Sequence, residues 1–297
     1  MNLNHFKDRR SFGAIKIWAA LALLPVASPA QVWPPPMPPE KTAKVYGQEI
    51  HYYERGTGPS VILLHGMVGT ATDWALTIGP VSRNHHVYAL DQIGFGHSAK
   101  PMIDYKIASF VDFLQEFMRV EHIPKATVVG NSIGGWIALD FAATYPAVVE
   151  RLVLVDAAGL DAPVHKNVPV DMNPSSIEGM RKVWEFLFYN KTLVTDSMVR
   201  FSWERRRQDG DSHTIQRLVA GLVAGNQFED SKVPSIRART LLIWGRNDEA
   251  TPLEVGERLH KAIPQSNLVV IDQCGHVPQI EKSADFNKAL TEFLAQP

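Results

Sequence analysis

Residues 128–136 read VVGNSIGGW, in which a short apolar run leads directly to a serine flanked by glycines. The following segment, residues 136–145, has the spacing of apolar side chains that is typical of a helix. The pattern Gly-x-Ser-x-Gly therefore lies between a strand and a helix, which is the context of a nucleophile elbow. The glycines let the strand and the helix approach across a strained turn that exposes the serine hydroxyl. The stretch predicts that Ser132 is a nucleophile.

The rest of the chain repeats this alternation of strand and helix. Six short runs are apolar on both alternating faces, which is typical of parallel strands covered on both sides: residues 61–64, 86–90, 126–130, 151–156, 240–245 and 268–271. Segments with helical spacing separate them. Before the first run, residues 44–56 alternate and end in a glycine-rich turn, which predicts an antiparallel edge hairpin. The order predicts an α/β fold with a doubly wound, mostly parallel sheet.

Residues 161–231 interrupt the alternation with helical segments alone, which predicts a helical cap between two parts of the core, residues 44–160 and 232–297. A capping box from Ser175 to Glu178 opens the first cap helix, and Thr195 and Ser212 open the next two. The cap is rich in aromatic residues, and we expect most of them to form its own core. One or two should face a ligand, and the candidates for substrate binding are Trp184, Phe188, Trp203 and, outside the cap, Val277.

The first thirty residues have the organisation of a secretory signal, in which basic residues precede the apolar stretch IWAALALLPVA and a Ser-Pro-Ala sequence. The apolar stretch is shorter than the roughly 20 residues that span a bilayer. We therefore expect a signal peptide over residues 1–30, export to the periplasm or the cell exterior, and no stable membrane span after its removal. Arg9-Arg10-Ser11-Phe12 resembles a twin-arginine signal, and retention as an anchor is the alternative. The proline-rich residues 31–43 predict a stiff linker.

Composition excludes some partners. The chain has 297 residues, 45% of them hydrophobic, and a formal net charge of -1, so it offers no electrostatic footprint for nucleic acid.

The only cysteine is Cys274, which excludes an intramolecular disulfide. We expect Cys274 to be a small packed side chain, with a catalytic role beside His276 as the alternative. The chain has no HExxH or paired CxxC motif, so the sequence predicts no metal and no cofactor.

A serine hydroxyl needs a base, and the base needs an acid. Reactive groups of a parallel sheet gather beyond the carboxyl ends of its strands. His276 follows the last apolar run and is the predicted base. Asp248 follows the preceding run and is the predicted acid, whereas Asp156, at the end of an earlier run, is the competing candidate.

The oxyanion that forms when the serine attacks a carbonyl needs two hydrogen-bond donors already in position. One donor should be the backbone N–H of Ile133, at the start of the elbow helix. The other should be the N–H of Met67, in the loop that follows the first central run. We expect the neighbouring His65 to brace this loop and not to act as a second base.

These stretches resemble the α/β-hydrolase superfamily, in the branch with a helical cap. The similarity covers residues 44–297 and rests on HG, DQIGFGHS, GNSIGG, GRND and GH at residues 65–66, 91–98, 130–135, 245–248 and 275–276. The resemblance implies a serine nucleophile, an acid and a base at Ser132, Asp248 and His276, and oxyanion donors at Met67 and Ile133. It also implies a structural role for Asp91 in the second motif.

Within the superfamily, GNSIGG and the cap sequence are similar to those of enzymes that hydrolyse carbon–carbon bonds of aromatic ring-cleavage products. Those enzymes usually carry an arginine and a tryptophan where this chain has Ser202 and Val277. Arg200 or Arg205 could replace the missing guanidinium. The departures at Ser202 and Val277 nevertheless weaken the carbon–carbon reading. We expect a carboxylic ester hydrolase that acts on small to medium apolar esters. A carbon–carbon hydrolase of vinylogous diketones is the alternative, followed by a non-catalytic binding protein. The oligomeric state stays open.

Overall fold

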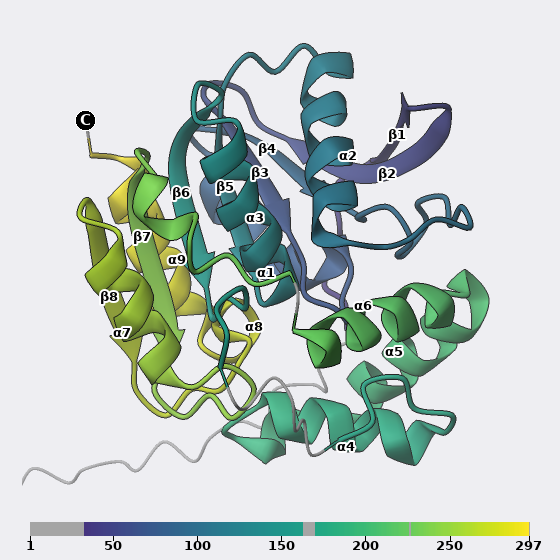
Figure 1. Ribbon diagram of the computed structural model, residues 1–297. Coiled ribbons are helices and arrows are strands. Elements are labelled where there is room, and N and C mark those ends of the chain that lie inside the picture. Colours follow the sequence, from purple (N-terminus) through teal and green to yellow (C-terminus); the bar gives the residue numbers. More distant parts are fainter. Residues whose placement is uncertain (1–32, 163–169, 226, 297) are drawn as a thin grey trace, which may run out of the picture. The chain divides into compact units, whose positions relative to one another are not determined.

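The computed structural model describes residues 33–162, 170–225 and 227–296 (Figure 1). The predicted signal peptide, with its twin-arginine-like stretch, lies outside the described residues. Within them, no helix combines the length and the apolar character that crossing a membrane requires.

An eight-stranded sheet forms the centre of the described chain, in the order β1-β2-β4-β3-β5-β6-β7-β8. The strands are β1 (Glu40–Val45), β2 (Gln48–Arg55), β3 (Ser60–Leu64), β4 (His86–Leu90), β5 (Ala126–Asn131), β6 (Val149–Val155), β7 (Arg239–Gly245) and β8 (Ser266–Ile271). β2 pairs antiparallel with both β1 and β4, and the remaining five pairs of the sheet are parallel. The predicted fold class, the edge hairpin and the six apolar strands are confirmed.

The first strand begins earlier than the sequence predicts. β1 starts at Glu40, inside the stretch 31–43 that was expected to be linker, because Glu40 already pairs with Tyr53 of β2. The register continues without a break to Val45 opposite Gln48. The side chains of Glu40–Thr42 are exposed, so this half of the strand lacks the apolar alternation by which a strand is recognised.

Helices cover both faces of the sheet (Figure 1). They are α1 (Ala75–Val81), α2 (Ile107–Val120), α3 (Ile133–Thr144), α7 (Leu253–Ala262), α8 (Pro278–Glu281) and α9 (Ser283–Leu294). In β3, Ile62 and Leu64 pack in one core with side chains of α2, α3 and α7, whereas Val61 and Leu63 pack in another with those of α1 and α9. Because each face of the sheet packs in its own core, both sets of alternating side chains in the strands are apolar.

Three further helices, α4 (Ile177–Leu187), α5 (Asp196–Asp209) and α6 (Ser212–Ala224), lie together beyond one end of the sheet (Figure 1). The N-cap of α4 is Ser176 and not Ser175, because the Ser176 hydroxyl accepts the Gly179 N–H at 3.0 Å. Thr195 caps α5, as predicted. Ser212 is the first residue of α6, but the N-cap of this helix is Asp211, and Gly225 ends it in the left-handed conformation. The limits of the predicted cap, residues 161 and 231, stay a prediction.

Short helical elements were not predicted from the sequence. They are α1, α8 and the 3-10 helices η1 (Ala71–Trp74), η3 (Lys191–Leu193) and η4 (Val233–Ser235). Each of them has at most seven residues, too few to show a repeating apolar face. α1 also contains Pro80, which argues against a helix when the sequence alone is considered.

Candidate active site

Ser132 stands at a strained turn between β5 and α3. Its backbone has φ 56° and ψ -119°, a conformation that non-glycine residues rarely adopt. Both motif positions require glycine for steric reasons. A Cβ on Gly130 would lie 2.1 Å from the Gly134 oxygen, and a Cβ on Gly134 would lie 2.3 Å from the Leu64 oxygen. The strand, the helix and the neighbouring strand β3 are therefore packed too closely for side chains at these positions. This is the geometry of a nucleophile elbow.

His276 lies in the loop between β8 and α8, and its ring contacts Asp248. The distance between His276 Nδ1 and Asp248 Oδ2 is 2.8 Å, and both side chains are almost completely buried. The hydroxyl of Thr251 donates to the same Asp248 oxygen at 2.6 Å, and two backbone N–H groups donate to the other. The carboxylate therefore fixes the orientation of the imidazole, which is the role predicted for Asp248.

Burial opposes ionisation of Asp248, but the adjacent His276 ring and its hydrogen bonds hold the pKa of this carboxyl below its ordinary value. The competing candidate, Asp156, has the opposite shift: burial, followed by the charge of Asp248, raises its pKa well above the ordinary value. Asp156 accepts the Gly245 N–H at 2.8 Å and forms no hydrogen bond with His276 among the described residues. Of the two carboxyls, Asp248 is the one placed and charged to act with the histidine.

Ser132 and His276 line the same cavity, together with Met67 and Ile133. No hydrogen bond joins Ser132 Oγ to the His276 ring in the described part of the chain, and such bonds often tighten only when substrate is bound. The His276 backbone is fixed from two sides: its N–H donates to Leu187 in the cap at 2.7 Å, and its oxygen accepts from Asn131 Nδ2 at 3.0 Å. The cap and the elbow thus position the predicted base.

The two predicted oxyanion donors flank the serine. Ile133 is the first residue of α3, where the N–H groups have no acceptor within the helix. Met67 lies in the loop after β3, which reaches the serine through Gly66: a Cβ on Gly66 would be 3.3 Å from Ser132 Cβ. These positions fit the predicted role, which stays a prediction.

His65 braces the loop that carries Met67. Its Nε2 accepts the Gln92 N–H at 3.1 Å, so its Nδ1 carries the proton and donates to the Gly66 oxygen at 2.7 Å. Burial lowers the pKa of His65 to about 4, so the ring is neutral at physiological pH. Both nitrogens are occupied, which leaves His65 unable to serve as a second base.

Cys274 is completely buried in the loop between β8 and α8, which also carries His276. Burial, together with the charge of Asp156, raises the pKa of its thiol far above the ordinary value. A thiol that does not ionise is a poor nucleophile, so the expected packing role fits and the catalytic alternative does not.

Two of the four predicted substrate-binding residues line the cavity, namely Trp184 and Val277. Phe188 does not, because α4 ends at Leu187 and the extended backbone of Phe188 turns its ring onto Trp184, 5.9 Å away between centroids. Trp203 is half-buried against the apolar cluster of the cap. The cap contributes Met172, Phe186, Leu187 and Leu222 to the cavity instead, which the sequence did not single out.

The two arginines that could stand in for a family arginine lie outside the cavity lining, although Arg205 Nη2 donates to the oxygen of Val68, a lining residue, at 3.4 Å. Ser202 accepts the Trp184 Nε1–H at 3.0 Å inside the cap. Arg205 is paired with Asp209 at 3.0 Å and Asp211 at 3.6 Å, and Arg200 is exposed on α5. Neither arginine belongs to the cavity lining.

Asp73, in η1, is an unexpected ionisable group of the cavity. Its side chain is buried, and this burial raises its pKa to about 7, although the charge of Arg205 partly opposes the shift. No signal in the sequence marks Asp73, because the fold of the loop around it determines its burial. Apart from His276, it is the only ionisable side chain in the described cavity lining.

The raised pKa of Asp73 predicts a pH-dependent stability. Between pH 4 and pH 7 the native state keeps a proton that the unfolded state loses, so the free energy of unfolding falls as the pH rises. Asp73→Asn removes this loss. From pH 5 to pH 8, we expect the unfolding free energy of wild type to fall by about 3 kcal/mol more than that of Asp73→Asn. Urea denaturation at both pH values measures this difference, with the exposed Asp112→Asn as the control. Parallel pH profiles of wild type and Asp73→Asn would contradict the assignment.

Comparisons with known proteins agree with the fold and the motifs. Residues 59–283 match the family described as alpha/beta hydrolase fold. A 2-hydroxy-6-oxo-2,4-heptadienoate hydrolase from Pseudomonas putida is 32% identical over 262 residues, which are 84% of this chain and 94% of the relative. A meta-cleavage product hydrolase of known structure from Pseudomonas fluorescens is 33% identical with a TM-score of 0.78, covering 86% of this chain and 97% of that one. A bacterial membrane phospholipase A has a TM-score of 0.79 at 26% identity, covering 86% and 85%.

Proposed function

The chain belongs to the α/β-hydrolase fold family and is a hydrolase, and from this premise we propose that it cleaves uncharged carboxylic esters by acyl transfer through Ser132. In this proposal the Ser132 hydroxyl attacks the ester carbonyl while His276 takes its proton. The N–H groups of Met67 and Ile133 stabilise the oxyanion, and Asp248 stabilises the imidazolium. His276 then protonates the leaving alcohol and activates the water that releases the acid.

The chemistry of the cavity is the observation that carries the ester proposal. Its cap side is apolar, with Met172, Trp184, Phe186, Leu187 and Leu222. The described lining holds no lysine or arginine, and Asp73 adds negative charge once the pH exceeds about 7. Such a cavity favours a neutral apolar acyl or alcohol group and disfavours a carboxylate. A small to medium apolar ester meets these requirements.

Hydrolysis of carbon–carbon bonds is the second candidate, and the names of the relatives favour it over ester hydrolysis. Six curated relatives, 30–32% identical, are hydrolases of 2-hydroxy-6-oxo dienoates or of a 2-hydroxymuconate semialdehyde. The dienoate substrates of these relatives carry a carboxylate, and the usual protein partner of a carboxylate is a guanidinium. The arginine and the tryptophan that such enzymes usually carry are replaced here by Ser202 and Val277. The phospholipase in the comparison supports the ester reading, as does the export proposed from residues 1–30.

A substrate panel separates the two candidates. For wild type at pH 8, we expect kcat/KM for p-nitrophenyl butyrate to exceed that for a 2-hydroxy-6-oxo-6-phenylhexa-2,4-dienoate by about 100-fold, since the latter brings an unpaired carboxylate into an apolar, acidic cavity. The primary carboxamide of the dienoate, which lacks the charge and offers no ester to hydrolyse, serves as the matched control. Faster cleavage of the free dienoate than of every ester would establish the carbon–carbon activity instead.

A non-catalytic binding protein is distinguished by a different measurement. A fluorophosphonate probe labels a serine that an adjacent base activates, and we expect wild type to be labelled at Ser132. Absence of labelling together with absence of turnover on the panel would favour the binding role.

A further inference from the structure

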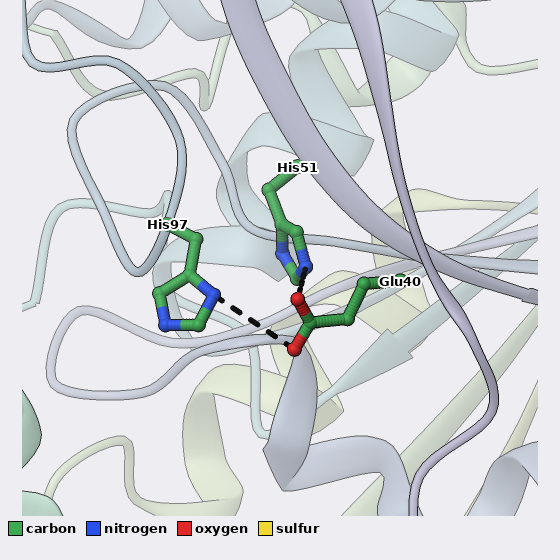
Figure 2. Close-up of side chains that lie close together, drawn as sticks. All are labelled: Glu40, His51 and His97. Atoms are coloured by element: carbon green, nitrogen blue, oxygen red, sulfur yellow. Dashed lines mark ion pairs between the residues drawn. The ribbon is translucent and has the colours of Figure 1, made fainter.

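Three potential metal ligands from separate parts of the chain converge at the antiparallel edge of the sheet. Figure 2 shows Glu40 of β1, His51 of β2 and His97 of the loop after β4 with their side chains directed toward one another. None of them lines the catalytic cavity. We propose that Glu40, His51 and His97 bind a divalent transition metal ion of the zinc class, with water completing its coordination.

The distances within this cluster are close to those of a zinc site. His51 Nε2 lies 3.7 Å from Glu40 Oε2, and His97 Nδ1 lies 4.0 Å from Glu40 Oε1. The three ligand atoms lie within 4.8 Å of one another. A tetrahedral zinc ion with bonds of about 2.0–2.1 Å places neighbouring ligand atoms about 3.4 Å apart. The Glu40 and His97 side chains are 57% and 55% exposed, which leaves room for the small movement that closes the difference.

His51 is already oriented as a metal ligand. Its side chain is 3% exposed, and its Nδ1 lies 2.8 Å from Asp91 Oδ2. Its other nitrogen, Nε2, is buried, points toward Glu40 and has no hydrogen-bond partner. A histidine that gives one nitrogen to a carboxylate and the other to the ion is the usual arrangement of a metal site. A buried polar atom without a partner calls for an explanation, which the ion supplies.

Asp91 organises a second ligand at the same time. The oxygen that holds His51 also accepts the backbone N–H of His97 at 2.9 Å. Its other oxygen accepts the Ala71 N–H at 2.8 Å, which ties the pair to the core. Two of the three ligands are therefore positioned by one buried carboxylate. Glu40 completes the set, and its Oε1 is further held by the Tyr53 hydroxyl at 3.3 Å.

A proton on His51 Nε2 is the competing occupant. Burial lowers the pKa of His51, but the hydrogen bond and charge of Asp91 and the charge of Glu40 raise it above the ordinary value. A proton on Nε2 would pair His51 with Glu40 and leave His97 only its ring contact with His51, at 4.9 Å between centroids, and its approach to Glu40 at 4.0 Å. An ion would join all three side chains directly.

Metal titration tests the site. Untagged protein, freed of metal with a chelator, is titrated with Zn²⁺ in competition with a fluorescent chelator. We expect one ion to bind wild type, and His97→Ala and Glu40→Gln each to weaken this binding by at least about tenfold. His122→Asn, at an exposed histidine elsewhere, is the matched control and should bind as wild type does. Both test variants alter exposed side chains, and thermal melting without metal verifies that they fold.

The catalytic cluster of Asp156, Asp248 and His276 also brings three potential ligands together, so His276→Ala is included. We expect this variant to keep the Zn²⁺ affinity of wild type. Zn²⁺ should raise the Tm of wild type and of His276→Ala but not that of His97→Ala. Absence of binding to wild type, equal affinity of His97→Ala and Glu40→Gln to wild type, or loss of binding in His276→Ala alone would overturn the proposal. These outcomes do not depend on ester hydrolysis.

Discussion

Ser132→Ala lowers kcat/KM for p-nitrophenyl butyrate by about 10⁴-fold or more, because acyl transfer has no route without the attacking hydroxyl. The alanine keeps the Cβ, so the backbone strain at φ 56° and the packing of the elbow are unchanged. The remaining rate should reflect only binding and the oxyanion donors. Steady-state kinetics with active-site titration of the wild type measures the loss.

Two controls make the result on Ser132 decisive. Ser235→Ala, at an exposed serine outside the cavity, should retain full activity. The melting temperature of Ser132→Ala should match that of wild type, which excludes unfolding as the cause. If Ser132→Ala kept most of the activity while folded, the acyl-enzyme proposal would be wrong.

Asp248→Asn lowers kcat by about 10³-fold or more, with a much smaller effect on KM. The amide retains the shape of the side chain, but it removes the negative charge that stabilises the imidazolium in the transition state. The 2.8 Å contact with His276 Nδ1 then no longer selects the tautomer in which Nε2 accepts the serine proton. The expected signature is therefore a fall in kcat in a protein that still binds substrate.

Asp156→Asn is the matched comparison, because the two carboxyls are buried neighbours at adjacent strand ends. Burial, followed by the charge of Asp248, raises the pKa of Asp156, so a neutral amide perturbs this residue less than it perturbs Asp248, whose pKa is lowered. We expect a loss below about tenfold. A greater loss in Asp156→Asn than in Asp248→Asn would reverse the assignment of the acid.

The sequence identifies the parts of this site that follow from local pattern. Ser132 is marked by the glycines on either side of it, and His276 and Asp248 are marked by their places directly after strands. Adjacent parallel strands carry their carboxyl ends to the same edge, so residues far apart in the chain meet there. These rules locate the site without knowledge of any distance.

Features that depend on exact chain ends or on contacts between distant segments escape such rules. One residue changes the direction of a helical side chain by about 100°. Phe188 follows Trp184 by four residues and would share its face in a longer helix. Because α4 ends at Leu187, Phe188 leaves that face and does not line the cavity, whereas Phe186 does. The burial of Asp73, and the meeting of Glu40, His51 and His97, each combine segments that have no shared motif.

The buried thiol of Cys274 is a natural probe of local opening near the catalytic residues. Since Cys274 is the only cysteine and lies two residues before His276, an alkylating reagent reaches it only when this part of the molecule opens. The alkylation rate in the native state therefore measures how often the catalytic end of the sheet loosens, without any engineered label.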